Sequence, residues 1–173
     1  LRPGGGEEVA GGCRYEAWAT SGSTASPPKD FTDASSTYGE PDGSYAYGDF
    51  SIGSNRWIKG TGYDLIGNGT ITKVEAIIPF YLDSSLTNDN VTLRLFNGAT
   101  ELGTARTFTT TYLNDNYVGA QNAHYLVWDI TDSSYSPDGS WSWDDFVLLT
   151  LHLEPTKVGG ADDNHINLDA LGF

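Results

Sequence analysis

The sequence predicts an all-β fold: a jelly-roll-like antiparallel β-sandwich of about eight strands, preceded by an extended N-terminal β-arm. Glycine is abundant, with 21 in 173 residues, and Met is absent, so strong helix formers are scarce. Short runs of alternating apolar and polar residues recur between turn signals. No stretch of ten or more residues shows helical periodicity, which further favours strands.

Eight candidate strands follow one another from residue 45 onward. In the longest, every second residue from Val74 to Leu82 is small or apolar, so this face is predicted to lie in the core. The same alternation places Leu126, Trp128 and Ile130 on one buried face. The predicted strands are Tyr45–Ile52, Arg56–Lys59, Ile71–Leu82, Asn90–Phe96, Thr104–Thr111, His124–Ile130, Phe146–Leu153 and His165–Leu171.

Two further apolar faces complete the predicted core. One consists of Val91, Leu93 and Leu95, and the other takes every second residue from Val147 to Leu153. The dipeptide Asn97-Gly98 between two candidate strands is a strong hairpin signal.

The N-terminal 26 residues differ from the rest of the chain, and a domain boundary is predicted between residues 26 and 27. From about residue 9 to residue 19 small or apolar residues alternate with more polar ones, as in a strand, and a Ser/Thr-rich linker follows at 20–28. Such a strand needs a sheet to join, which a second copy, or this domain itself, would supply; a disordered tail is the third alternative. The predicted donor-strand residues are Val9, Gly11, Cys13, Tyr15, Ala17 and Ala19.

Residues 29–173 resemble the extracellular jelly-roll modules of phage tail, adhesin and fibre proteins. The resemblance lies in Asp42–Tyr47, Gly69–Ala76, the Trp-bearing segment before Phe146, and Asn164–Asp169. With its arm, the chain is similar to subunits of bacterial and archaeal surface filaments that assemble by donor-strand exchange. The resemblance implies an extracellular structural subunit whose partner is itself, in a helical homopolymer with a role in adhesion.

Composition argues against several other classes of function. The net charge is −14 with only nine basic residues, so neither nucleic acid nor an anionic membrane is an expected partner. No run approaches the roughly 18 apolar residues of a membrane span. Cys13 is the single cysteine, and Asp144-Asp145 point to opposite faces if extended, so no catalytic set emerges and an enzyme is not expected.

Calcium is the cofactor that the turn residues permit. Several Asp residues adjoin Gly- or Asn-rich turns, where carboxylate and carbonyl oxygens can converge on a cation. Solvated turn carboxylates are the alternative explanation. The candidate ligands are Asp42, Asp49, Asp162, Asp163 and Asp169.

Aromatic pairs and sequons suggest glycans. Trp141 and Trp143 share a face if extended and, with Trp57 as a third platform, would stack on sugar rings; otherwise they cap the core or pack against a neighbouring subunit. A carbohydrate-binding module, with calcium as an optional cofactor, is therefore the alternative function. Asn68 and Asn90 begin N-glycosylation sequons, so covalent glycans are also an expectation.

Overall fold

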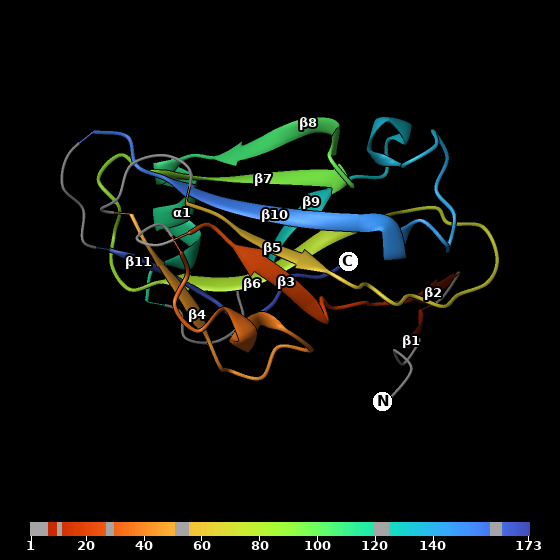
Figure 1. The fold of residues 1–173 in the computed structure, drawn as a ribbon, viewed down its shortest axis with the longest axis horizontal. Helices are drawn as coiled ribbons and strands as arrows, with labels where there is room; N and C mark the ends of the chain where they lie inside the picture. The colour runs from red at the N-terminus through yellow and green to blue at the C-terminus, as the bar shows by residue number, and fades with distance from the viewer. Residues whose placement is uncertain (1–6, 10–11, 27–29, 51–55, 120–124, 160–163) are drawn as a thin grey trace.

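The computed structural model describes residues 7–9, 12–26, 30–50, 56–119, 125–159 and 164–173. For residues 7–9, 12 and 13 it describes the backbone alone. Two layers of strands are stacked on each other (Figure 1). The front layer of this view is a five-stranded sheet, and the layer behind it has four strands.

The described residues form two antiparallel sheets and a small hairpin, which confirms the predicted β-sandwich. The strand order is β3-β5-β10-β7-β8 in one sheet and β4-β11-β6-β9 in the other, and β1 pairs with β2. The strands are β1 (Glu7–Val9), β2 (Gly12–Arg14), β3 (Ser21–Thr24), β4 (Ala46–Asp49), β5 (Ile58–Thr61), β6 (Glu75–Leu82), β7 (Asn90–Asn97), β8 (Thr100–Phe108), β9 (Tyr125–Asp129), β10 (Leu149–Thr156) and β11 (His165–Leu168).

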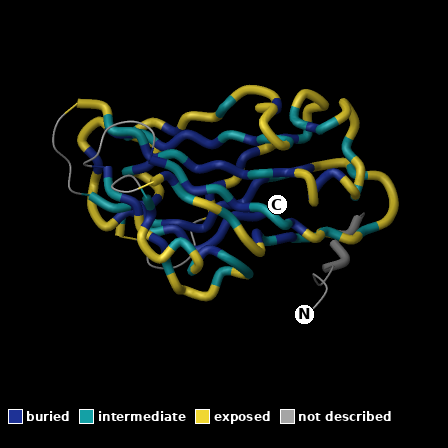
Figure 2. Tube along the Cα trace, in the orientation of Figure 1, coloured by how far each residue is buried: buried dark blue, intermediate teal, exposed yellow. Residues whose placement is uncertain are grey.

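The core lies between the two sheets, as the dark blue tube in Figure 2 shows. The predicted faces of β6, β7 and β9 are all buried, including Val74, Leu93 and Trp128. The prediction that Val147 lies in the core is wrong, because this residue is 61% exposed. It lies in the 3₁₀ turn η3 (Phe146–Leu148), where the two-residue alternation of a strand no longer holds.

The predicted hairpin at Asn97-Gly98 is present. Asn97 pairs with Thr100, which leaves Gly98 and Ala99 as a two-residue loop between β7 and β8. Gly98 has a φ of 59°, a backbone angle that favours glycine.

The structure contradicts a detached donor strand at Ala17 and Ala19. Ala17 and Phe173 exchange backbone hydrogen bonds of 3.0 and 2.9 Å, and the Ala19 N–H donates to the Leu171 carbonyl at 2.9 Å. Both alanines are buried in the core of their own chain. Their alternation with polar residues therefore reflects burial within the same sandwich. This matches the alternative in which the domain itself supplies the sheet that the strand joins.

The predicted linker is also wrong in part, because Ser21–Thr24 is strand β3 at the edge of the five-stranded sheet. It pairs with β5, with Ser21 opposite Thr61 and their hydroxyls 2.9 Å apart. A Cβ at Gly22 would overlap the Lys59 carbonyl, so the small residues that suggest a linker are needed for this close approach. The sandwich thus begins before residue 26, the predicted domain boundary.

A short helix, α1 (Thr110–Tyr117), replaces the end of the predicted strand Thr104–Thr111. Thr109 is its N-cap, and the Thr109 hydroxyl accepts a hydrogen bond from the Tyr112 N–H. Leu113 and Tyr117, four residues apart, are buried against the core. At eight residues the helix is too short for its periodicity to stand out in the sequence.

Removing the N-terminal segment tests whether it belongs to this fold. A variant lacking residues 1–24 is expected to lose several kcal/mol of unfolding free energy, since each lost hydrogen bond contributes about 1 kcal/mol. A variant lacking residues 1–13 is the control and should keep most of its stability. Urea unfolding of both variants is the measurement. A stable, monomeric protein without residues 1–24 would instead support a donated arm.

Candidate functional site

The outer face of the five-stranded sheet carries aromatic and charged side chains in place of the apolar ones that face the core. Cross-strand pairing aligns them in rows: Lys59 lies opposite His152, and His152 lies opposite Arg94. In the adjacent row Phe96 of β7 lies opposite Glu101 of β8. We call this surface the open face and define it by Trp57, Lys59, Arg94, Phe96, Glu101, His152 and Glu154.

Three rings form a cluster on the open face. The His152 ring makes an edge contact with Trp57, with centroids 5.4 Å apart, and a tilted contact with Phe96 at 5.7 Å. The Lys59 ammonium lies 4.5 Å from the Trp57 centroid and 5.8 Å from that of Phe96. Cation–π attraction therefore holds this cation over the two rings, which are themselves half-buried.

His152 is the buried centre of this cluster. Neither of its ring nitrogens has a hydrogen-bond partner among the described residues. Burial, together with the smaller effects of the positive charges of Lys59 and Arg94, lowers the pKa of His152 to about 4. At neutral pH the imidazole is uncharged, and it acts as an aromatic support for the two outer rings.

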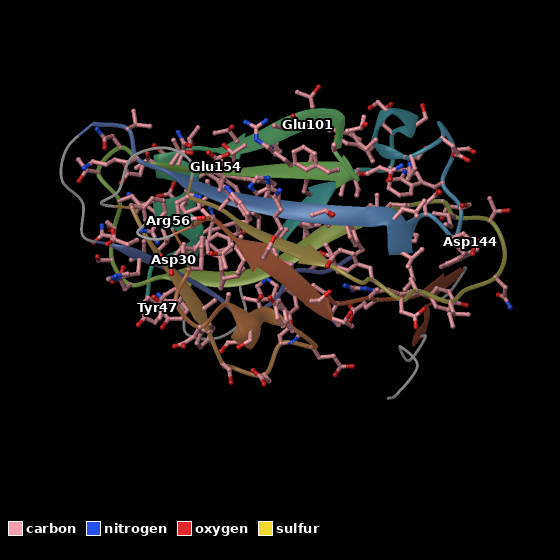
Figure 3. The ribbon with its side chains drawn as sticks, in the orientation of Figure 1. Asp30, Tyr47, Arg56, Glu101, Asp144 and Glu154 are labelled. Carbon is pink, nitrogen blue, oxygen red and sulfur yellow. The ribbon has the colours of Figure 1, made fainter. Side chains whose placement is uncertain are left out.

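Arg94 organises the charged part of the open face. Its Nη1 lies 2.9 Å from Glu101 Oε1, and its Nε lies 3.6 Å from Glu154 Oε2. Figure 3 labels the two glutamates, which come from different strands of the front sheet. Together with Lys59, the open face holds two cations and two anions, so its formal charge is zero. The whole chain, in contrast, has a net charge of −14.

The structure does not place Trp141, Trp143 and Trp57 on one surface. Trp141 stacks on buried Phe146 with centroids 5.5 Å apart, and its Nε1 donates to the Ile130 carbonyl. This geometry matches the predicted alternative of a core cap. Of the three indoles, Trp57 alone is part of the open face.

Trp143 borders a different feature, a cavity of about 450 Å³. Its ring meets Tyr15 edge-on at 4.9 Å, and its Nε1 donates to the Gly69 carbonyl at 2.9 Å. A second cavity of about 750 Å³ lies between the edge strands β8 and β9 and includes Arg106 and Val127 in its lining. Neither cavity coincides with the open face.

Of the three predicted calcium ligands that the structure describes, Asp42 and Asp169 lie next to each other. The buried Asp169 carboxylate accepts hydrogen bonds from the Asp42 N–H at 3.0 Å and the Gly43 N–H at 3.2 Å, so it anchors a loop. Burial raises the pKa of Asp169 despite these donors. Asp49 is on β4, opposite His165.

Within the described ranges, no three His, Cys, Asp or Glu residues are grouped so as to hold a metal ion. Asp162 and Asp163 lie outside the described residues, as does Gly11 of the predicted donor strand. Calcium binding therefore stays a prediction.

Both sequon asparagines are at least partly accessible. Asn68 is exposed beside Gly69, whose φ is 88°. Asn90 is half-buried and is the first residue of β7, where it pairs with Thr156. Covalent glycosylation stays a prediction at both positions.

Sequence reasoning identified Trp57 and missed the other members of the open face. The available signal was the period of two in β7 and β10. Arg94 and Phe96 occupy the positions between the core residues of β7, and His152 does the same in β10. The pattern indicates their outward direction, but it does not indicate which strands lie side by side.

No protein-family model matches the chain, and no curated protein matches it. Among solved structures, the chain is similar to one described as the X-ray crystal structure of a non-crystalline cellulose specific carbohydrate-binding module, CBM28. The TM-score is 0.39 at 13% identity, and the match covers 96% of this chain and 76% of that chain. A likeness at this level gives neither a family nor a ligand. Separately, no helix within the described ranges is long and apolar enough to cross a membrane.

The depressed pKa of His152 predicts a pH-dependent contribution to stability. Its unfolded pKa is about 6.5 and its folded pKa is about 4, so the unfolded chain binds the extra proton between these values. The contribution is present above pH 6.5 and falls by about 3 kcal/mol as pH drops to 4. Urea unfolding of the native protein and of His152→Gln across this range should show the difference. An imidazole NMR titration of His152 with a midpoint near 6.5 would contradict this.

Proposed function

We propose that this protein is a non-catalytic carbohydrate-binding module and that the open face of the five-stranded sheet is its binding surface. The observation that carries the proposal is the pairing of two half-exposed rings, Trp57 and Phe96, with charged hydrogen-bonding groups on the same face. The apolar side of a sugar ring suits an aromatic platform, and its hydroxyls suit carboxylate and guanidinium groups. The strands hold both kinds of group in fixed rows.

The charge pattern favours a neutral glycan. Each anion of the open face already neighbours Arg94, and Lys59 lies over aromatic rings. A negatively charged polysaccharide would meet two glutamates there and a net charge of −14 overall. A neutral ligand needs only hydrogen bonds, which these paired groups can still donate and accept from their outer sides.

An extracellular location fits a glycan ligand and is part of this proposal. Assembly into a filament through residues 9–19 has no support from the described contacts, because Ala17 and Ala19 pair with residues 171–173 of the same chain. The alternative of the sequence analysis is therefore preferred to its main hypothesis, with the binding surface moved away from Trp141 and Trp143.

Substitution of the two platforms tests the proposed surface. Trp57→Ala and Phe96→Ala should each weaken binding to a neutral polysaccharide roughly tenfold, which corresponds to about 1.4 kcal/mol of lost contact. Affinity electrophoresis through gels that contain soluble neutral glucans, mannans or xylans is the measurement, with polygalacturonate as the acidic contrast.

Tyr47→Ala is the matched control, because Tyr47 is a 40% exposed aromatic residue on β4 of the other sheet. It should leave binding unchanged. Trp141→Ala should lower thermal stability without selective loss of binding, since Trp141 packs on Phe146. Undiminished retardation of both platform variants, with loss in Tyr47→Ala, would refute the assignment of the surface.

A further inference from the structure

His152 is buried although it lies on the outer face of a sheet, where side chains usually meet solvent. Its exposed fraction is 8%, and neither ring nitrogen has a hydrogen-bond partner among the described residues. Buried polar atoms without a partner are rare in folded proteins, because they have given up their hydrogen bonds to water. A ligand that reaches these nitrogens therefore satisfies them, provided that the group covering them can move.

Lys59 supplies part of that cover. It lies directly opposite His152 on the neighbouring strand, so both side chains point to the open face. The Lys59 ammonium is 4.5 Å from the Trp57 centroid and 5.8 Å from the Phe96 centroid. These are the two rings that contact the imidazole. Because Lys59 is half-buried and His152 is buried, the ammonium lies between the rings on the solvent side of the imidazole.

The two cations beside His152 are held with different strength. Arg94 lies 2.9 Å from Glu101 and 3.6 Å from Glu154, so two carboxylates fix its position. Within the described residues, the Lys59 ammonium is held by its two cation–π contacts alone. Cation–π attraction is weak at accessible sites, and the lysine stem is flexible. Lys59 is therefore the part of the cover that a ligand displaces most easily.

We propose that His152 is the hydrogen-bonding floor of the glycan site and that Lys59 is a displaceable cover over it. A sugar ring that stacks on Trp57 and Phe96 takes the place of the Lys59 ammonium, and one sugar hydroxyl bonds the imidazole. A hydroxyl suits either tautomer, because it donates to the acceptor nitrogen or accepts from the N–H. This inference rests on the proposed function and adds a buried polar contact to it.

The cover makes Lys59 a competitor of the sugar. In the free protein the ammonium occupies the same ring faces on which the sugar stacks. Binding must break these two contacts, so the loss of Lys59 strengthens binding even though it removes a hydrogen-bond donor from the open face. A lysine that held the sugar directly would have the opposite effect. The sign of the change in affinity therefore separates the two roles.

Calorimetric titration with cellohexaose, mannohexaose and xylohexaose tests both roles. Lys59→Ala should raise the affinity about threefold, because the competing cation–π contacts are gone. His152→Phe keeps a ring between the two platforms and removes only the nitrogens, so it should lower the affinity about fivefold. His152→Leu serves the same purpose if the larger ring does not fit. Lys73→Ala is the matched control: it removes the same charge beside Glu75 of the other sheet and should change nothing.

The outcomes distinguish this inference from the proposed function. Weaker binding by Lys59→Ala, or unchanged binding by the His152 variants, would overturn the inference while Trp57→Ala still abolished binding. Failure of the native chain and of Lys59→Ala to bind any of the three sugars would refute the glycan site, and this inference with it.

A second measurement tests the cover without any sugar. Diethyl pyrocarbonate at neutral pH modifies uncharged imidazoles that solvent reaches, and mass spectrometry locates the modified residue. His152 should react roughly tenfold faster in Lys59→Ala than in the native chain, because a buried group reacts only from opened states. His165, half-buried on the other sheet, should react equally in both chains and calibrates the reagent. Equal rates at His152 would show that Lys59 is not its cover and would overturn the proposal.

Discussion

The pairing of Gly172 between Trp18 and Ile77 is the constraint on which the arrangement of the sandwich depends. It places the segment after β11 inside the sheet, with the N-terminal segment on one side and β6 on the other. Gly is required there because a Cβ would lie 2.8 Å from the Ala17 carbonyl and would overlap the Trp18 ring. From this junction the chain crosses to the other sheet, where the Thr20 N–H donates to the Thr61 carbonyl and β3 begins. The N-terminal segment thus ties the two sheets together.

The sequence predicted those parts of the fold that depend on local alternation. Each of the eight predicted strands overlaps an observed strand, because burial on one side imposes a period of two wherever the core is continuous. It failed where structure depends on contacts between distant segments. Ser21–Thr24 has the composition of a linker, and only the pairing with β5, forty residues later, makes it a strand. The same holds for Ala17 and Ala19, whose small side chains suit both a donated strand and a strand next to residues 171–173. Local patterns cannot separate these two cases.

On the open face, local sequence patterns likewise predict the direction of a side chain but not which strands are neighbours. That Arg94 and Phe96 point away from the core follows from their alternation with Leu93 and Leu95. That His152 lies between Phe96 and Trp57 follows from the order β5-β10-β7, which no local pattern contains. For Trp141 and Trp143 the local pattern predicted a shared face that the structure does not have. A spacing of two residues places two indoles on one face only in an extended chain. Here Trp143 lies within a turn over residues 142–145, and each indole N–H donates to a different carbonyl.

The charged groups of the open face are already paired before any ligand arrives. On the open face the charged groups already neighbour one another, so a glycan exchanges part of these contacts for its own hydroxyls, and the net gain per hydrogen bond is small. Binding there should depend mainly on the apolar area that Trp57 and Phe96 offer. Ligand chemistry at the open face therefore follows from what the fold leaves without a polar partner there, which is the accessible area of the two rings.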